Sequence, residues 1–316
     1  MINWGIIGAG NIAHRFADSL AEVDDAELYA IANRTIEKAK KFQTEHPSQK
    51  AYDSYEELLA DDNIDVVYIA LPHKYHLNWV EKSFHAGKAV LCEKPATLSA
   101  ADTKKIAILA KEQNIFFMEA MKSRFTPVYQ AVKKLVENGA IGEVTQVFTS
   151  LCRVFPITKE SYHYQSDQGG CLLDMGVYNA AFIEDFIDGP LKLETIDYEL
   201  FENQVEVYVK ATLQSGNQTA IIESAFDRET ETKVVISGTK GSITVPDFHR
   251  PTRYELELDG DKEIIEVPYV VDDFYGEITH VMQCLDQEIP ESPIMSLKNS
   301  ENVAVILEQL KDAIEL

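Results

Sequence analysis

Short apolar runs alternate with amphipathic helical segments over the first part of the chain. The apolar runs cover 2–7, 27–32, 65–71, 89–92 and 115–119. The continuous run at 65–71 is typical of a strand that is buried on both faces. Because helical segments separate the runs, we expect each strand to be followed by a helix. This order predicts an α/β fold with a doubly wound parallel sheet.

The second part of the chain has a different pattern of apolar and polar positions. Residues 205–213 alternate apolar and polar side chains, which predicts a half-buried antiparallel strand. Further strands of this kind are expected at 143–152, 193–201, 218–226, 232–237, 241–246 and 252–258. Helices are expected at 127–138, 174–187, 274–286 and 298–314.

The change in the pattern of apolar and polar positions near residue 122 predicts two domains. A chain of 316 residues also suits two domains, at about 150 residues for each. We expect the first domain over 1–122, with the parallel sheet. The second domain, over 123–316, is expected to be an α+β domain with a large open, mainly antiparallel sheet.

The predicted second sheet carries apolar side chains on both faces. Tyr208, for example, points to the face opposite Val207 and Val209. Helices before and after the strands can cover one face only, and a broad apolar face left open is unusual in a monomer. A second copy of the chain can cover it with the same surface. We therefore expect a homodimer formed through the C-terminal sheet.

The charge balance excludes several classes of partner. The chain has 29 basic and 52 acidic residues, a net charge of −23. Such a surface repels nucleic-acid phosphates and anionic lipids, although a small anion can bind where the local field is positive. No apolar run approaches the ~20 residues that cross a bilayer. We expect no nucleic-acid partner, no membrane partner and a small-molecule substrate.

The start of the chain and the cysteines indicate a cytoplasmic protein. The chain enters a strand at once, with no basic start and no cleavage site of a signal peptide. The cysteines are too far apart for a zinc pattern or a redox pair, and we expect reduced thiols. They are Cys92, Cys152, Cys171 and Cys284. No metal site is predicted, because the histidines also lack the spacing of metal ligands. Those considered are His14, His46, His85, His249 and His280.

A glycine-rich turn follows the first strand and opens the first helix. Gly8-Ala9-Gly10-Asn11-Ile12-Ala13 fits the Gly-x-Gly-x-x-Gly/Ala pattern in the context that dinucleotide binding requires. The first glycine permits the tight turn, and the second lets a pyrophosphate approach the backbone. We therefore predict a Rossmann domain with Gly8, Gly10, Asn11 and Ile12 at the cofactor. The alternative is a tight turn without a ligand.

The end of the second strand indicates which dinucleotide is bound. An NAD site usually has Asp or Glu there, to accept a hydrogen bond from the ribose 2′-hydroxyl group. This chain has Asn33 followed by Arg34. Because a guanidinium group can pair with a 2′-phosphate, NADP(H) is favoured and NAD(H) remains possible. The alternative is an arginine on a solvated loop.

Four further motifs carry a family resemblance. They are Leu71-Pro72-His73-Lys74-Tyr75-His76, Glu93-Lys94-Pro95, Arg124-Phe125-Thr126-Pro127 and the segment from Gly169-Gly170 to Tyr178. With the glycine turn, they resemble the glucose-fructose oxidoreductase/inositol dehydrogenase/MocA family over essentially the whole chain. The resemblance implies hydride transfer between nicotinamide and a sugar, polyol or similar alcohol. It also implies a candidate cis bond between Lys94 and Pro95, and cofactor contacts from Leu71, Pro72, His73, His76, Glu93 and Lys94.

The chain departs from the main pattern of that family at one helix. Many members carry Asp and then His four residues later, whereas this chain carries Asp174 and Tyr178. Tyrosine there is similar to the dimeric dihydrodiol dehydrogenase and D-xylose dehydrogenase branch. That branch often has Trp in place of Lys122, which puts its substrates in doubt for this chain. We expect Lys94, Asp174 and Tyr178 to be catalytic, with Tyr178 as the general acid/base.

Four residues are expected to line the substrate pocket: Arg124, Phe125, Tyr162 and His163. For Arg124 the alternative is an ion pair between the domains, and His163 is an alternative proton donor. Two other functions stay open at this point. One is an NADP-binding regulator without catalysis, and the other is NAD-dependent glycoside hydrolysis on the same fold. The favoured function is that of an NAD(P)-dependent dehydrogenase or reductase. Its expected substrate is a sugar-like compound or a cyclic diol.

Overall fold

The computed structural model describes residues 1–314 and divides into two compact units. The first unit comprises residues 1–122 and 270–301, and the second comprises residues 123–269 and 302–314. The boundary after residue 122 coincides with the change in the pattern of apolar and polar positions. Residues 270–301, however, return to the first unit, so the expectation of one uninterrupted second domain over 123–316 needs correction.

Apolar contacts explain why this segment joins the first unit. The segment includes helix α8 (Tyr275–Asp286). The Phe274 side chain is fully buried, and its ring lies 6.3 Å from that of Phe16, edge to face. The indole N–H of Trp4 points at the sulfur of Met282, 3.3 Å away. The amphipathic pattern of α8 predicts a helix but does not say which unit its apolar face joins.

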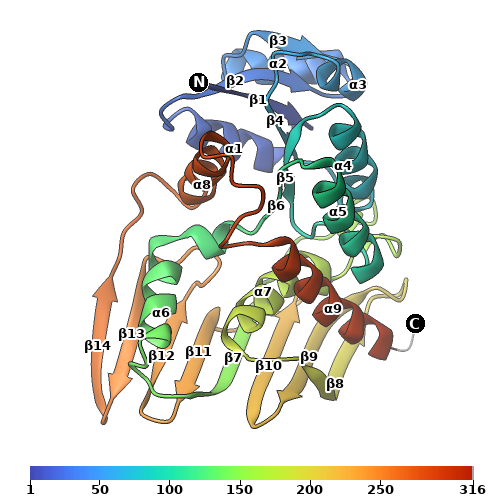
Figure 1. The fold of residues 1–316 in the computed structure, drawn as a ribbon. Helices are drawn as coiled ribbons and strands as arrows, with labels where there is room; N and C mark the ends of the chain where they lie inside the picture. The colour runs from blue at the N-terminus through green and yellow to red at the C-terminus, as the bar shows by residue number, and fades with distance from the viewer. Residues whose placement is uncertain (315–316) are drawn as a thin grey trace. The chain divides into compact units, whose positions relative to one another are not determined.

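The first unit contains a parallel sheet of six strands in the order β3-β2-β1-β4-β5-β6, drawn from blue to green in Figure 1. This confirms the doubly wound sheet. The strands are β1 (Ile2–Ile7), β2 (Ala26–Ala32), β3 (Lys50–Tyr52), β4 (Val66–Ile69), β5 (Ala89–Glu93) and β6 (Phe117–Ala120). The helices are α1 (Asn11–Leu20), α2 (Ile36–Glu45), α3 (Tyr55–Leu59), α4 (His76–His85) and α5 (Ala100–Gln113), with a 3-10 turn at His73–Tyr75.

The second unit contains an eight-stranded sheet in the order β14-β13-β12-β11-β7-β10-β9-β8. Its pairs are antiparallel except β7 with β10, which confirms a mainly antiparallel sheet. The strands are β7 (Val144–Cys152), β8 (Lys192–Leu200), β9 (Glu206–Ser215), β10 (Gln218–Ala225), β11 (Lys233–Gly238), β12 (Gly241–Pro246), β13 (Arg253–Leu258) and β14 (Asp261–Glu266).

Helices cover one face of this sheet. Figure 1 shows α6 (Pro127–Glu137) and α7 (Val177–Phe186) on the same side of the strands. From Val207 onward the buried side chains of β9 are those at alternate positions, such as Val209, Ala211 and Leu213. The period-two pattern therefore predicted correctly which residues of this strand form the core. Helix α9 (Leu297–Ala313) begins in the first unit and ends in the second.

Two strands lack the apolar pattern on which the prediction depends. Strand β3 has three residues, too few for a detectable alternation. Strand β14 is mostly exposed and polar, and only the turn at Asp259-Gly260 indicated it. Both lie at sheet edges, where a strand can be held by backbone hydrogen bonds to one neighbour.

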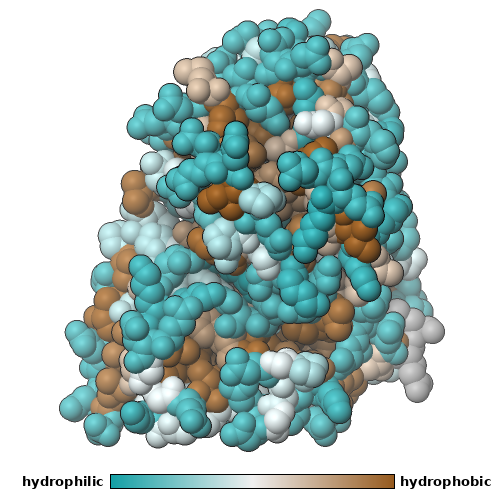
Figure 2. Space-filling model, viewed as in Figure 1, coloured by the Kyte–Doolittle hydropathy of each residue, from teal (hydrophilic) through white to brown (hydrophobic). Residues whose placement is uncertain are grey.

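The surface and the cysteines give little information about where in the cell the protein is located. Hydrophilic residues predominate over the face drawn in Figure 2, as the net charge of −23 leads one to expect. All four cysteines are buried with free thiols. Across residues 1–314, no helix has the length and hydropathy of a membrane span. A cytoplasmic location stays a prediction.

Candidate active site

The glycine turn between β1 and α1 has the geometry of an anion-binding loop. Gly8 has φ +102°, and a Cβ atom there would lie 2.4 Å from the carbonyl oxygen of Ala70, so only glycine fits. Gly10 differs, because a Cβ atom on it would meet no heavy atom of residues 1–314 within 4 Å. The chain's own packing therefore does not require glycine at position 10, whereas a ligand lying against the backbone does.

The first turn of α1 offers donors to such a ligand. Gly10 is the N-cap residue, and no side chain caps the helix. Asn11 is exposed and Ile12 is half-buried, so both border the open space at Gly10. Free amide groups and the positive end of the helix dipole together favour an anion. These residues fit the pyrophosphate of a dinucleotide.

A cavity of about 430 Å³ lies at the end of β2, beside Arg34. Arg34 is exposed, and the amide group of Asn33 donates to the carbonyl oxygen of Thr35 at 3.2 Å. Burial raises the pKa of the Tyr55 hydroxyl, and the Arg34 cation beside it opposes this shift. The other residues of the cavity wall are Asp53, Ser54, Glu56, Leu71, Pro72, Tyr75, Asn78 and Trp79. The aromatic side chains of this wall suit the adenosine of a dinucleotide.

His76 joins two of the family motifs. Its ring nitrogens lie 2.8 Å from the carbonyl oxygen of Pro95 and 2.7 Å from that of Leu71. Burial lowers the pKa of this imidazole, and a neutral ring can donate to only one of these two acceptors at a time. His73 is also buried, 5.9 Å from His76 between ring centroids. His76 therefore holds the segment that follows Lys94 against the end of the Leu71 motif.

Lys94 follows strand β5 at the carboxyl edge of the parallel sheet. The Lys94–Pro95 bond is cis, as the family resemblance implied, and Lys94 itself is half-buried. Ligands of doubly wound sheets bind at this edge. Glu93, just before it, is buried and accepts a hydrogen bond from the hydroxyl of Tyr68. Burial raises the pKa of the Glu93 carboxyl group.

A buried charge cluster lies near Glu93, and sequence reasoning missed it. Lys122 and Arg15 both pair with the carboxylate of Asp273. Lys122 also lies 5.1 Å above the ring of Phe274. The fully buried carboxyl group of Glu277 completes the cluster, and burial raises its pKa well above the usual range. In place of the tryptophan common in the similar branch, Lys122 thus has an ion pair inside the first unit.

In the second unit, Asp174 and Tyr178 share an exposed stripe. Within residues 171–183 they are half-exposed, and every other side chain is buried. Asp174 lies in a π-helical turn (Leu172–Gly176) directly before α7, not at the N-cap position that a simple helix start would give it. The ring of Tyr178 lies 6.2 Å from that of His249. Both side chains can therefore reach a ligand on the same surface.

His163 lies next to Asp174, which the sequence did not suggest. Nε2 of His163 is 3.6 Å from Oδ2 of Asp174, and its Nδ1 is 2.8 Å from the hydroxyl oxygen of Ser161. The ring stacks on Tyr162, with centroids 3.9 Å apart. The two residues are eleven positions apart in the chain, so their spacing did not indicate the pair. The structure thus brings Asp174, Tyr162 and His163 together within one unit.

Arg124 is placed differently from the prediction. Its side chain has no exposed surface, and its guanidinium group lies 2.6 Å from a carboxylate oxygen of Glu184. It also donates to the carbonyl oxygen of Ala181. Arg124 therefore forms a buried ion pair inside the second unit, and its contact with substrate stays a prediction. Phe125, expected beside the substrate, is also buried, at 7% exposed.

The parallel sheet and the glycine turn are those of a nicotinamide-dependent oxidoreductase. Comparison with known proteins agrees with this interpretation. The family model described as "Oxidoreductase family, NAD-binding Rossmann fold" matches residues 2–121. The model of the GFO/IDH/MocA C-terminal domain matches residues 129–244. The chain belongs to the Gfo/Idh/MocA oxidoreductase family, as its motifs indicated, and it is an NAD(P)-dependent dehydrogenase or reductase.

Several relatives match nearly the whole chain. The trans-1,2-dihydrobenzene-1,2-diol dehydrogenase of Xenopus tropicalis is 35% identical, over 97% of this chain and 96% of that protein. The enzyme of the same name from Mus musculus is 32% identical, over 99% and 97%. Among solved structures, a 3-ketoreductase from Actinomadura kijaniata in complex with NADP and TDP-benzene has a TM-score of 0.89 at 25% identity, with 98% and 97% covered. An aldose-aldose oxidoreductase from Caulobacter crescentus, 21% identical with TM-score 0.90, shares the fold over 99% and 97%.

Proposed function

We propose that this protein transfers hydride between NADP(H) and an alcohol or carbonyl group of a cyclic diol or sugar-like substrate. The observation that carries the proposal is the open space at Gly10, bordered by uncapped amide groups of α1. The Arg34 cavity of the same unit adds a place for the adenosine end. Relatives named for a dihydrobenzene diol support a cyclic diol as substrate.

Asp174, His163 and Tyr178 are suited to a substrate with neighbouring hydroxyl groups. A carboxylate accepts a hydrogen bond from a hydroxyl group, whereas an imidazole and a phenol can either accept one from it or donate one to it. The stacked Tyr162 and His163 rings add an apolar wall beside these polar atoms. A diol or a sugar offers this combination of polar edges and an apolar face.

The proton is proposed to move through Tyr178. Reduced nicotinamide, when bound, supplies a hydride to the carbonyl carbon, and the carbonyl oxygen then needs a proton. The Tyr178 hydroxyl donates that proton in reduction and accepts it back in oxidation. A free tyrosine has a pKa of about 10, and an ammonium group nearby stabilises the phenolate. We assign stabilisation of the phenolate to Lys94. Asp174 is assigned the role of orienting Lys94 or a substrate hydroxyl group.

Absorbance of the reduced nicotinamide tests the proposal directly. Purified protein is incubated with NADP⁺ and a panel of trans-diols, aldoses and polyols, and in the reverse direction with NADPH and the matching carbonyl compounds. Net reduction of NADP⁺ with at least one diol or sugar is expected. Cleavage of a glycoside without net change of the cofactor, or cofactor binding without turnover across the panel, would contradict it.

Arg34→Ala is expected to weaken NADP(H) binding by about tenfold to a hundredfold, or about 1.4–2.8 kcal/mol, and NAD(H) binding much less. The reason is that only NADP(H) carries the 2′-phosphate that a guanidinium group can pair with. Titration of both cofactors into the wild type and the variant measures this. Lys38→Ala, which removes an exposed cation of the neighbouring helix, is the control. Equal affinities for the two cofactors in the wild type would exclude the preference.

A homodimer through the open face of the second sheet is also proposed. Phe148 of β7 pairs with Ile221 of β10 on one side and with Val235 of β11 on the other. All three side chains are half-exposed, on the face opposite the buried residues of these strands. They form an apolar row in the middle of the sheet, which a second copy of the chain can cover.

Light scattering of the wild type at micromolar concentration is expected to give twice the mass of the chain. Phe148→Lys is expected to shift the protein to the monomer, because two lysines would face each other in an apolar interface. Val305→Lys places the same charge on an exposed apolar position of α9 and should leave the dimer intact. A wild type that is monomeric would refute the dimer.

A further inference from the structure

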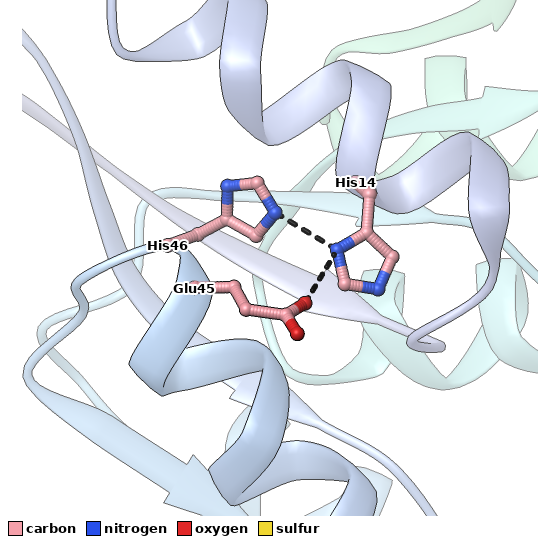
Figure 3. A group of neighbouring side chains, drawn as sticks. All are labelled: His14, Glu45 and His46. Carbon is pink, nitrogen blue, oxygen red and sulfur yellow. Dashed lines mark hydrogen bonds and ion pairs between the residues drawn. The ribbon is translucent and has the colours of Figure 1, made fainter.

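Two histidines that lie 32 positions apart in the chain meet in the first unit. His14 belongs to α1, and Glu45 and His46 lie at the end of α2. Nδ1 of His14 is 2.8 Å from Nε2 of His46 and 3.4 Å from Oε2 of Glu45, as Figure 3 shows. The ligating atoms of the three side chains all lie within 4.8 Å of one another.

We propose that His14, Glu45 and His46 bind a zinc ion, with water completing the coordination. Imidazole and carboxylate are ordinary zinc ligands, and bonds of about 2.0–2.2 Å in a tetrahedral site separate neighbouring ligand atoms by about 3.3 Å. The observed separations of 2.8 Å and 3.4 Å lie on either side of that value. A small rotation of the exposed Glu45 side chain brings its oxygen to the third position.

The surroundings of His46 add an independent observation. Its other ring nitrogen, Nδ1, lies 3.4 Å from a carboxylate oxygen of Asp18. Histidines that bind metals commonly donate their second N–H group to a carboxylate, which fixes the tautomer. With its proton on Nδ1, His46 directs the lone pair of Nε2 towards His14 and Glu45. Asp18 therefore prepares His46 to be a ligand.

The proton between the two rings marks the position for the metal. When His46 presents a lone pair, the Nδ1–H group of His14 donates to it and also points towards Glu45. Moving that proton to Nε2 of His14 leaves two nitrogen lone pairs and a carboxylate directed at the same point. The zinc ion takes the place of the shared proton, and no other bond changes.

Aromatic packing explains only part of this arrangement. The ring of Phe42 lies 4.4 Å from that of His14 and 4.7 Å from that of His46, so both imidazoles pack on one buried side chain. Packing does not account for three ligand atoms that converge, or for Asp18 behind one of them. Lys41 pairs with Oε1 of Glu45 at 3.7 Å, which leaves Oε2 directed towards His14. The net charge of −23 further favours a cation.

The proposed site joins the helix that follows the glycine turn to the end of the next helix. Since α1 begins at Asn11, directly after the turn, a metal at His14 restrains the element that presents the cofactor-binding amide groups. Zinc is therefore expected to raise the unfolding temperature of the protein, because a ligand that binds only the folded state stabilises it.

Isothermal titration of zinc chloride into the chelator-stripped full chain tests the proposal. One equivalent is expected to bind, and cobalt(II) in its place should give the visible absorption of a four-coordinate ion with nitrogen and oxygen ligands. His14→Gln, His46→Gln and Glu45→Gln should each lower the affinity. Asp18→Asn, which removes only the outer carboxylate, should lower it by about tenfold.

The control is His85→Gln, which removes an exposed histidine of α4 in the same unit and should leave binding unchanged. Glu45 is exposed, so its variant is expected to keep the unfolding temperature of the metal-free wild type and report on binding alone. Absence of zinc binding by the wild type would overturn the proposal. So would binding that His14→Gln, His46→Gln and Glu45→Gln reduce no more than His85→Gln does.

Discussion

Replacing Tyr178 with phenylalanine is expected to lower turnover by about 10²- to 10⁴-fold and to leave cofactor affinity nearly unchanged. The substitution keeps the ring, which is half-exposed beside Asp174 on the stripe of residues 171–183, and removes only the oxygen that carries the proton. Cofactor binding is assigned to the glycine turn and the Arg34 cavity of the other unit, which this substitution does not touch. Steady-state kinetics and cofactor titration measure the two effects separately.

A matched control comes from the same unit. Tyr198→Phe removes the hydroxyl of a half-buried tyrosine on strand β8 and should change neither quantity. If Tyr178→Phe kept near-full turnover while hydride transfer limited the rate, the proton donor would lie elsewhere. His163, 3.6 Å from Asp174, would then be the next residue to replace.

Lys94→Met is expected to lower turnover at least as much as Tyr178→Phe and also to weaken binding of the nicotinamide cofactor. The lysine stands at the end of β5, at the sheet edge where ligands of this fold bind, and methionine keeps its length without its charge. Loss of the ammonium group removes the cation to which we assign stabilisation of the phenolate. The combined change in turnover and cofactor affinity separates this lysine from Tyr178.

Lys104→Met serves as the control, because Lys104 is an exposed lysine on α5 of the same unit. Lys94→Arg, which keeps a positive charge in a different shape, should recover part of the cofactor affinity if charge is what matters. Wild-type turnover in Lys94→Met would remove Lys94 from the catalytic set.

Local signals were sufficient for the elements that build the sheets. The glycine turn is a run of six residues whose roles depend on neighbouring backbone atoms, and the structure gives Gly8 and Gly10 the conformation and the open space that its pattern implies. Ser54 and Ser99 cap their helices by accepting from the amide groups of Glu57 and Asp102, three residues later. Such interactions are predictable because both partners lie within one turn of the chain.

Polar partners far apart in the chain were not predictable in this way. Arg124 looked like a substrate contact, yet its partner is Glu184, 60 positions later, inside the same unit. The pairs His163 with Asp174 and Lys122 with Asp273 were equally hidden. A polar residue on one element says nothing by itself about which charge the fold will place opposite it.

By itself, the sequence determined the class of protein, the residues of the cofactor turn, and the order of strands and helices except for the edge strands β3 and β14. The tertiary structure decided that residues 270–301 join the first unit, and that His14 and His46 face each other although no ligand spacing connects them. The physical reason is the separation along the chain over which each kind of interaction acts. Periodicity, capping and turn chemistry act between neighbours, whereas packing of apolar faces and meetings of charged groups depend on how distant segments are brought together.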